Sequence, residues 1–140
     1  MKHLVLITAL LIGAAANAQS PPAGPTDDIA QNLFAPDLVF KYRDAIGLDE
    51  AQSKALKDLV QKAQGRFLDL QWDMQAEAGK LAQLLRLPRV DETAALAQVD
   101  KVLGLEREVK RAQISLLIGI NNLLTPAQQQ KLLDLRGKSP

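Results

Sequence analysis

Two five-residue segments of the chain, Leu48–Gln52 (LDEAQ) and Leu124–Gln128 (LTPAQ), have the form of a helix start. Asp49 and Thr125 stand at the N-cap position, where a side-chain oxygen accepts a backbone N–H of the first turn. The glutamine three residues later can accept the N–H of the cap residue in return, which completes a capping box. The pair therefore predicts helices that begin at two defined points of the chain.

Apolar residues at helical spacing predict two long helices. The first runs from Asp49 to about Leu87, since Pro88 disfavours helix in the residue before it. At 1.5 Å per residue it is about 55–60 Å long. The second begins after Asp91, which caps it. Each helix has one apolar face, interrupted in the first helix by Glu77. These faces consist of Leu56, Leu59, Ala63, Phe67, Leu70, Met74, Leu81 and Leu84, and of Val99, Val102, Leu105, Val109, Ala112, Leu116, Ile120 and Leu123.

Shorter helices are expected on either side of this hairpin, over Pro36–Gly47 and from Thr125 to about Leu135. No segment alternates apolar and polar residues at strand spacing, so the fold class is all-α. We expect one helical domain over residues 32–136. A Pro-rich flexible leader over residues 19–31 precedes it, and a frayed tail over residues 137–140 follows.

A long hairpin with two short end helices cannot cover all of its own apolar surface. The stretch Ile114–Ile120 is apolar around most of the helix circumference, so packing against one other helix would leave part of it in water. Association with a second copy of the chain would cover this apolar surface. The sequence therefore predicts an elongated homodimer.

The N-terminal residues Met1–Ala18 have the pattern of a secretory signal peptide. Lys2 and His3 form a short basic region, Leu4–Ala16 is apolar, and Ala16-Asn17-Ala18 fits a cleavage site. The apolar run is shorter than the ~20 residues that a membrane span needs. We therefore expect an exported protein without stable membrane insertion.

The residues left after cleavage exclude several classes of function. Loss of Lys2 leaves 16 basic against 16 acidic side chains, and this neutral balance argues against a nucleic-acid partner. His3 is the single histidine and the chain has no cysteine. Cysteine nucleophiles, histidine bases and Ser-His-Asp triads are thus excluded. We expect neither an enzyme nor a bound cofactor.

The LDEAQ and LTPAQ segments, the export signal and the helical hairpin together resemble the Spy/CpxP group of periplasmic LTXXQ-motif proteins. The segment Asn32–Val39, leading into Ile46-Gly47-Leu48, also looks like the heavy-metal sensor and resistance relatives of that group. The resemblance covers about residues 32–135, and Asp49 departs from the motif's threonine. It implies an antiparallel dimer of bent hairpins that forms a thin periplasmic cradle. Members include an ATP-independent chaperone, an inhibitor of an envelope-stress sensor kinase and metal-responsive proteins.

The metal-responsive relatives use histidine, with carboxylates and methionine, as ligands. The mature chain has no histidine, and Met74 lies on an apolar face where a core role is the simpler interpretation. Glu106 and Glu108 are two residues apart and do not share a helix face. We therefore predict no tight transition-metal site.

A chaperone needs apolar or aromatic groups near charge, to hold many clients weakly. Trp72 lies about 160–200° around its helix from Leu70 and Met74, so it faces either a second copy or a client. For Phe67 and Met74, a place in the hairpin core is the simpler interpretation. The candidate client-binding or dimer surface comprises Phe34, Phe40, Tyr42, Arg43, Arg66, Phe67, Trp72 and Met74.

The predicted function is ATP-independent, non-covalent binding of unfolded or stressed envelope proteins in the periplasm. The alternative is a stress- or metal-response accessory protein that regulates a membrane sensor kinase or a metal-resistance system. A chaperone binds many clients, whereas a regulator binds one partner, and the sequence identifies neither.

Overall fold

The computed structural model describes residues 31–138. It contains the helices α2 (Pro36–Lys41), α3 (Glu50–Leu85), α4 (Glu92–Leu123) and α5 (Pro126–Gly137). Every regular element within residues 31–138 is helical, which confirms the all-α prediction. The predicted signal peptide, Met1–Ala18, and the leader up to residue 30 lie outside the described residues.

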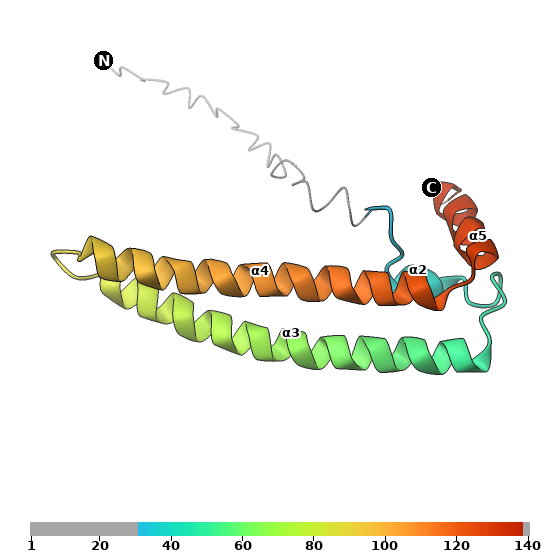
Figure 1. The fold of residues 1–140 in the computed structure, drawn as a ribbon, viewed down its shortest axis with the longest axis horizontal. Coiled ribbons are helices and arrows are strands. Elements are labelled where there is room, and N and C mark those ends of the chain that lie inside the picture. The colour runs from blue at the N-terminus through green and yellow to red at the C-terminus, as the bar shows by residue number, and fades with distance from the viewer. Residues whose placement is uncertain (1–30, 139–140) are drawn as a thin grey trace, which may run out of the picture.

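Helices α3 and α4 form a long antiparallel hairpin, and α2 and α5 lie at the end opposite the connecting turn (Figure 1). With 36 and 32 residues, the two long helices extend about 54 and 48 Å at 1.5 Å per residue. Helix α3 ends at Leu85, two residues before the predicted end at about Leu87, and definitions of a helix end commonly differ by one or two residues. The predicted hairpin is confirmed.

Both predicted capping boxes are present. The Asp49 carboxylate accepts the N–H of Gln52 at 2.7 Å, and the N–H of Asp49 donates to Gln52 Oε1 at 3.1 Å. Thr125 Oγ1 accepts the N–H of Gln128 at 3.2 Å, and the N–H of Thr125 donates to Gln128 Oε1 at 2.9 Å. Asp91 caps α4 as expected, accepting the N–H of Ala94 at 3.1 Å. Local side-chain chemistry therefore sets where all three helices begin.

The first helix is shorter than predicted. Regular α2 ends at Lys41, and the chain continues through further helical turns before it reverses at Gly47. Gly47 has φ = 65°, and the flanking bonds run from Leu48 N–H to the Arg43 carbonyl (2.9 Å) and from Gly47 N–H to the Asp44 carbonyl (3.3 Å). These two bonds form a Schellman motif. Gly47 thus ends the helical segment as predicted, but the segment is irregular after Lys41.

The hairpin has two differently packed regions. We call residues 31–60 and 116–138, where α2 and α5 meet the ends of the hairpin, the base. Residues 61–115, which include the connecting turn, are the arm. Nine of the twelve buried residues among those described belong to the base, so the core is concentrated there. The main cluster contains Phe34, Val39, Ile46, Leu56, Ile120, Leu124 and Leu132.

The predicted apolar faces do point inward. Every residue of the two predicted faces is buried or half-buried, and so is Glu77. Within the arm, however, only Leu70, Ala95 and Gln98 are fully buried. Two helices alone leave most inward side chains half-covered, because each helix has one neighbour.

Candidate functional site

The two motif glutamines bind each other at the base. Gln52 Nε2 donates to Gln128 Oε1 at 2.8 Å, and Gln128 Nε2 donates to Gln52 Oε1 at 3.0 Å. The acceptor oxygen of each glutamine also accepts the N–H of its own cap residue. The capping boxes of α3 and α5 are thereby joined into one hydrogen-bonded unit, which we call the glutamine lock.

The lock also holds neighbouring backbone. Gln52 Nε2 donates to the carbonyl of Leu123, the last residue of α4, at 3.1 Å. Gln128 Nε2 lies 3.3 Å from the Gly47 carbonyl and 3.4 Å from that of Ile46. Gln128 is 9% exposed, so its amide depends on protein partners for hydrogen bonding. The motif residues therefore connect the turn before α3 with three helix ends, which is an architectural role.

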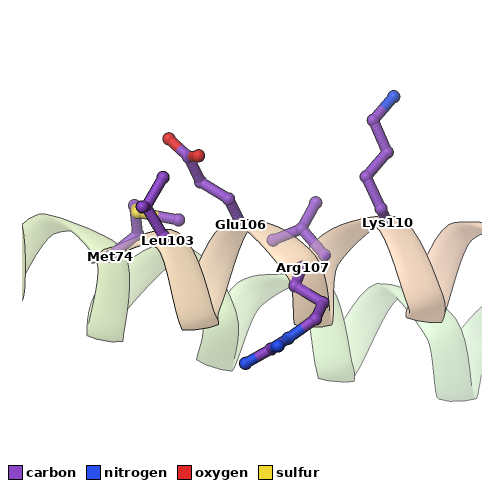
Figure 2. Close-up of a pocket in the computed structure, with 6 residues that line it drawn as sticks. Met74, Leu103, Glu106, Arg107 and Lys110 are labelled. Atoms are coloured by element: carbon purple, nitrogen blue, oxygen red, sulfur yellow. The ribbon is translucent and has the colours of Figure 1, made fainter. Parts of the chain in front are cut away.

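A shallow groove runs along α4 from the arm to the edge of the base. One hollow of about 450 Å³ is lined by Met74 of α3 and by α4 residues that include Leu103 and Val109 (Figure 2). The next, of about 510 Å³, is lined by residues that include Ile114 and Ile118. Both hollows are lined by Arg107 and Lys110, so they form one surface, which we call the α4 groove. Its apolar side chains are accessible to a partner.

The α4 groove carries more basic than acidic groups. Arg107, Lys110 and Arg111 line it, against Glu106 alone. In Figure 2, Glu106 and Lys110 project to one side of α4 and Arg107 to the other. An apolar floor with charge at its edge can hold an apolar segment while the charges remain in water.

Ion pairs on the Glu108 carboxylate, one between α3 and α4 and one within α4, add little to the stability of the arm. Arg66 of α3 lies 3.7 Å from Glu108 of α4, and Arg111 lies 4.0 Å from the same carboxylate. All three side chains are about half exposed or more, and such surface pairs are worth only about 0–1 kcal/mol.

A second apolar feature is on α3. Leu68 and Trp72, one helical turn apart, are 53% and 65% exposed. This agrees with the predicted position of Trp72 away from the inward face of its helix.

The structure removes Phe34 from the predicted candidate surface. Phe34 is 2% exposed, and the Arg136 guanidinium lies 5.2 Å from its ring centre. Arg136 also donates to the Leu33 carbonyl at 3.0 Å, which holds it over the ring. The sequence did not predict the burial of Phe34, because the side chain that covers its ring belongs to α5, about 100 residues further along the chain.

The other predicted surface residues divide between the two regions. Phe40 and Tyr42 are half-buried against the base core, and Lys41 lies 5.0 Å from the Tyr42 ring centre. Exposed Arg43 is 3.6 Å from Asp44. In the arm, Arg66 and Trp72 are exposed, whereas Phe67 and Met74 are half-buried. Only the arm residues lie near the α4 groove or the exposed face of α3.

Several residues of this surface were not predicted. Leu68, Leu103 and Ile118 are 46–53% exposed. For the residues on α4 a signal was available, because Leu103, Arg107, Lys110, Ile114 and Ile118 recur at helical spacing beside the inward face. The partial exposure of the stretch Ile114–Ile120 was predicted, and exposed Ile118 confirms it.

A polar link crosses the arm near its turn. Gln98 Nε2 donates to the Glu77 carbonyl at 2.9 Å and to its carboxylate at 2.6 Å. Lys80 donates to the same carboxylate at 2.7 Å. These bonds, first that from Lys80 and then that from Gln98, hold the pKa of Glu77 below its ordinary 4.5. Glu77, the one polar break in the α3 face, is thus explained by its partner on α4.

Within residues 31–138 no group of three or more His, Cys, Asp or Glu side chains is placed to hold a metal ion. The same residues contain no His or Cys, the ligands that transition metals favour. The described residues thus do not fit a transition-metal site. Among the helices of this part of the chain, none is both long and apolar enough to span a membrane.

Comparison with protein families matches residues 2–131 to the family described as heavy-metal resistance. That family belongs to the clan of Spy/CpxP LTXXQ-motif proteins, so the predicted resemblance is confirmed. Comparisons with curated proteins and with solved structures give no match.

Proposed function

Because the chain belongs to the heavy-metal resistance family, within the Spy/CpxP LTXXQ-motif clan, we propose a non-catalytic binding function for it. The proposed function is ATP-independent, non-covalent binding of unfolded or stressed envelope proteins. The family is generally non-enzymatic, which agrees with the prediction from residue types that the protein is not an enzyme. The proposed compartment is the periplasm, on the strength of the signal pattern in Met1–Ala18.

One observation carries this proposal: the arm leaves large apolar side chains in water. Seven of the nine exposed large apolar residues among those described belong to it, so the exposure is concentrated away from the core. They are Leu68, Trp72, Leu85, Leu87, Val90, Leu96 and Leu103. Leu68 and Trp72 lie one helical turn apart and Leu103 lies in the α4 groove, and clustered exposed apolar side chains of this kind mark interaction sites.

The difference in packing between the base and the arm suits a protein that binds many different clients weakly. The base holds the hairpin together, so the arm does not need a complete core of its own. Apolar side chains of the arm stand beside charges such as Arg107 and Arg66 rather than in a deep, shaped pocket. A shallow surface of this kind binds many apolar segments without imposing one geometry.

The test is aggregation of a chemically unfolded, unrelated client, with and without the mature protein and with no ATP. We expect suppression at near-stoichiometric amounts. Leu103→Asp, in the α4 groove, should lose most of it, whereas Leu133→Asp, an exposed leucine of α5 outside the arm, should retain it. No suppression of two different clients by the unmodified protein would refute the proposal.

A second candidate is a metal-response accessory protein that acts on one partner, such as the periplasmic domain of a sensor kinase. The family description favours it. Since the described residues do not fit a transition-metal site, this role would operate through protein contact. Nickel, zinc, copper or cobalt titration should give no micromolar binding, and capture of a single partner without client suppression would favour this candidate.

A further inference from the structure

The described chain begins beside one end of the α4 groove (Figure 1). Phe34 belongs to the same buried cluster as Ile120, and exposed Ile118, which lines the groove, is two residues earlier on α4. Arg136 fixes this entry point, because it donates to the Leu33 carbonyl at 3.0 Å. The residues that precede position 31 are therefore attached next to the groove.

The groove has an excess of cationic groups. Arg107 and Lys110 line both of its hollows and Arg111 lines the second, against the one carboxylate of Glu106. Within residues 31–138 Arg107 forms no ion pair. Arg111 is 4.0 Å from Glu108 and its side chain is 75% exposed, so that contact is easily exchanged for another. An acidic segment with some apolar surface would complement this groove.

Residues 19–30 (QSPPAGPTDDIA) have that composition. Asp27 and Asp28 are acidic, and the segment contains no lysine or arginine. Ile29 and three prolines supply apolar surface. Proline fixes φ and favours extended backbone in the residue before it, so a segment of this kind loses less entropy when it lies along an apolar groove.

We propose that residues 19–30 bind in the α4 groove of their own chain. Ile29, the residue nearest the entry point, covers the exposed Ile118. Asp27 and Asp28 then lie beside Arg111 and the other cationic groups. The prolines continue toward Leu103, so the segment runs parallel to α4.

The segment is long enough for this path. From Leu103 to Ile118 the groove extends about 22 Å along α4, at 1.5 Å per residue. Twelve extended residues span about 40 Å, which exceeds that length. Attachment next to the groove also gives the segment a high effective concentration, so weak contacts are sufficient to hold it.

This inference assigns a regulatory role to residues 19–30, and that role rests on the proposed function. The segment occupies the apolar surface that an unfolded client would use, so the client has to displace it. Clients with a longer or more apolar segment would compete best. The segment thus shields Leu103 and Ile118 from water when no client is present.

Cysteine pairs test the docking in the full mature protein, because the chain has no cysteine of its own. Thr26→Cys keeps both aspartates, and it is combined with Ile114→Cys, which lies in the groove. The matched control combines it with Gln113→Cys, an exposed neighbour that does not line the groove. We expect a disulfide within one chain to form about fivefold faster with Ile114→Cys than with Gln113→Cys.

The preference for the groove should depend on charge. Adding Asp27→Asn and Asp28→Asn to the Thr26/Ile114 cysteine pair should reduce the cross-linking rate to that of the control. Equal rates for the two pairs of the unmodified segment, a preference that survives loss of both aspartates, or disulfides that form between copies instead of within one chain would each overturn the docking.

Client suppression tests the regulatory role separately. Asp27→Lys with Asp28→Lys should suppress aggregation at an about threefold lower protein concentration, because the groove is released. Asp44→Lys with Asp58→Lys makes the same change in net charge at exposed positions outside the segment, and it should behave as the unmodified protein does. Equal suppression by both double variants would refute regulation by the segment. If the cross-linking preference holds but no variant suppresses aggregation, the chaperone proposal fails and the docking stands.

Discussion

The base and the arm contain the same two helices but differ in how they are held. In the base, α2 and α5 add further neighbours, and side chains such as Leu56, Ile120 and Leu132 are completely buried. In the arm, α3 and α4 have only each other, and Trp72 and Leu103 remain exposed. Burial along a helix thus depends on the number of neighbouring elements as much as on its apolar pattern.

Both regions use a glutamine to join their helices, but with different chemistry. The base pairs two neutral amides, Gln52 and Gln128, in a partly buried setting. The arm joins Gln98 to the carboxylate of Glu77, which also contacts Lys80 near solvent. The amide pair of the base contains no ionisable group, whereas the arm pair contains the Glu77 carboxylate with its lowered pKa, so acid should affect the two pairs differently.

The largest expected difference in stability is between truncation of a buried leucine in the base and truncation of an exposed leucine in the arm. Leu56→Ala in the base should lower the free energy of unfolding by about 2–5 kcal/mol, because a fully buried leucine leaves a cavity. Leu68→Ala in the arm should change it by no more than about 0.5 kcal/mol, since that side chain is exposed. Urea unfolding followed by circular dichroism measures both. Equal losses would contradict the division into base and arm.

The glutamine lock should give the next largest effect. Gln128→Ala should cost about 1–3 kcal/mol of unfolding free energy, because it leaves buried polar groups without partners. Gln64→Ala, an exposed glutamine of α3, is the control and should be near neutral. A double-mutant cycle with Gln52→Ala should show strong coupling. Additive losses would mean that the two amides do not act as a unit.

The smallest expected effect is the weakening at acidic pH of the hydrogen bonds between Gln98 and Glu77 in the arm. Since the pKa of Glu77 is lowered in the folded protein, its stabilising contribution is complete above about pH 4.5 and declines as the pH falls through the folded pKa. As the pH falls, the protection factors of amides near Glu77 and Gln98, which are corrected for the intrinsic pH dependence of exchange, should therefore decrease before those around the glutamine lock do. Glu77→Gln should remove this pH dependence. An acid response of equal size in that variant would assign the effect to other carboxylates.

Much of the fold follows from local sequence signals. The cap residues Asp49, Asp91 and Thr125 determine where three helices begin, because an N-cap needs only the N–H groups two or three residues away. The inward faces of α3 and α4 follow from the spacing of apolar residues, since that spacing is the period of the helix itself. The resemblance to the LTXXQ-motif clan, drawn from the motif pair together with the export pattern and the helical hairpin, is confirmed by the family match.

Only the tertiary structure determined which of these residues contact one another. Local chemistry makes Gln52 and Gln128 capping residues, but their mutual bond depends on α3 and α5 starting side by side. Phe34 is buried because α5 places Arg136 over it, and Trp72 is exposed because no third helix covers the arm. Contacts between distant segments, unlike helix starts, depend on how elements meet in space, and a single sequence carries no local record of that.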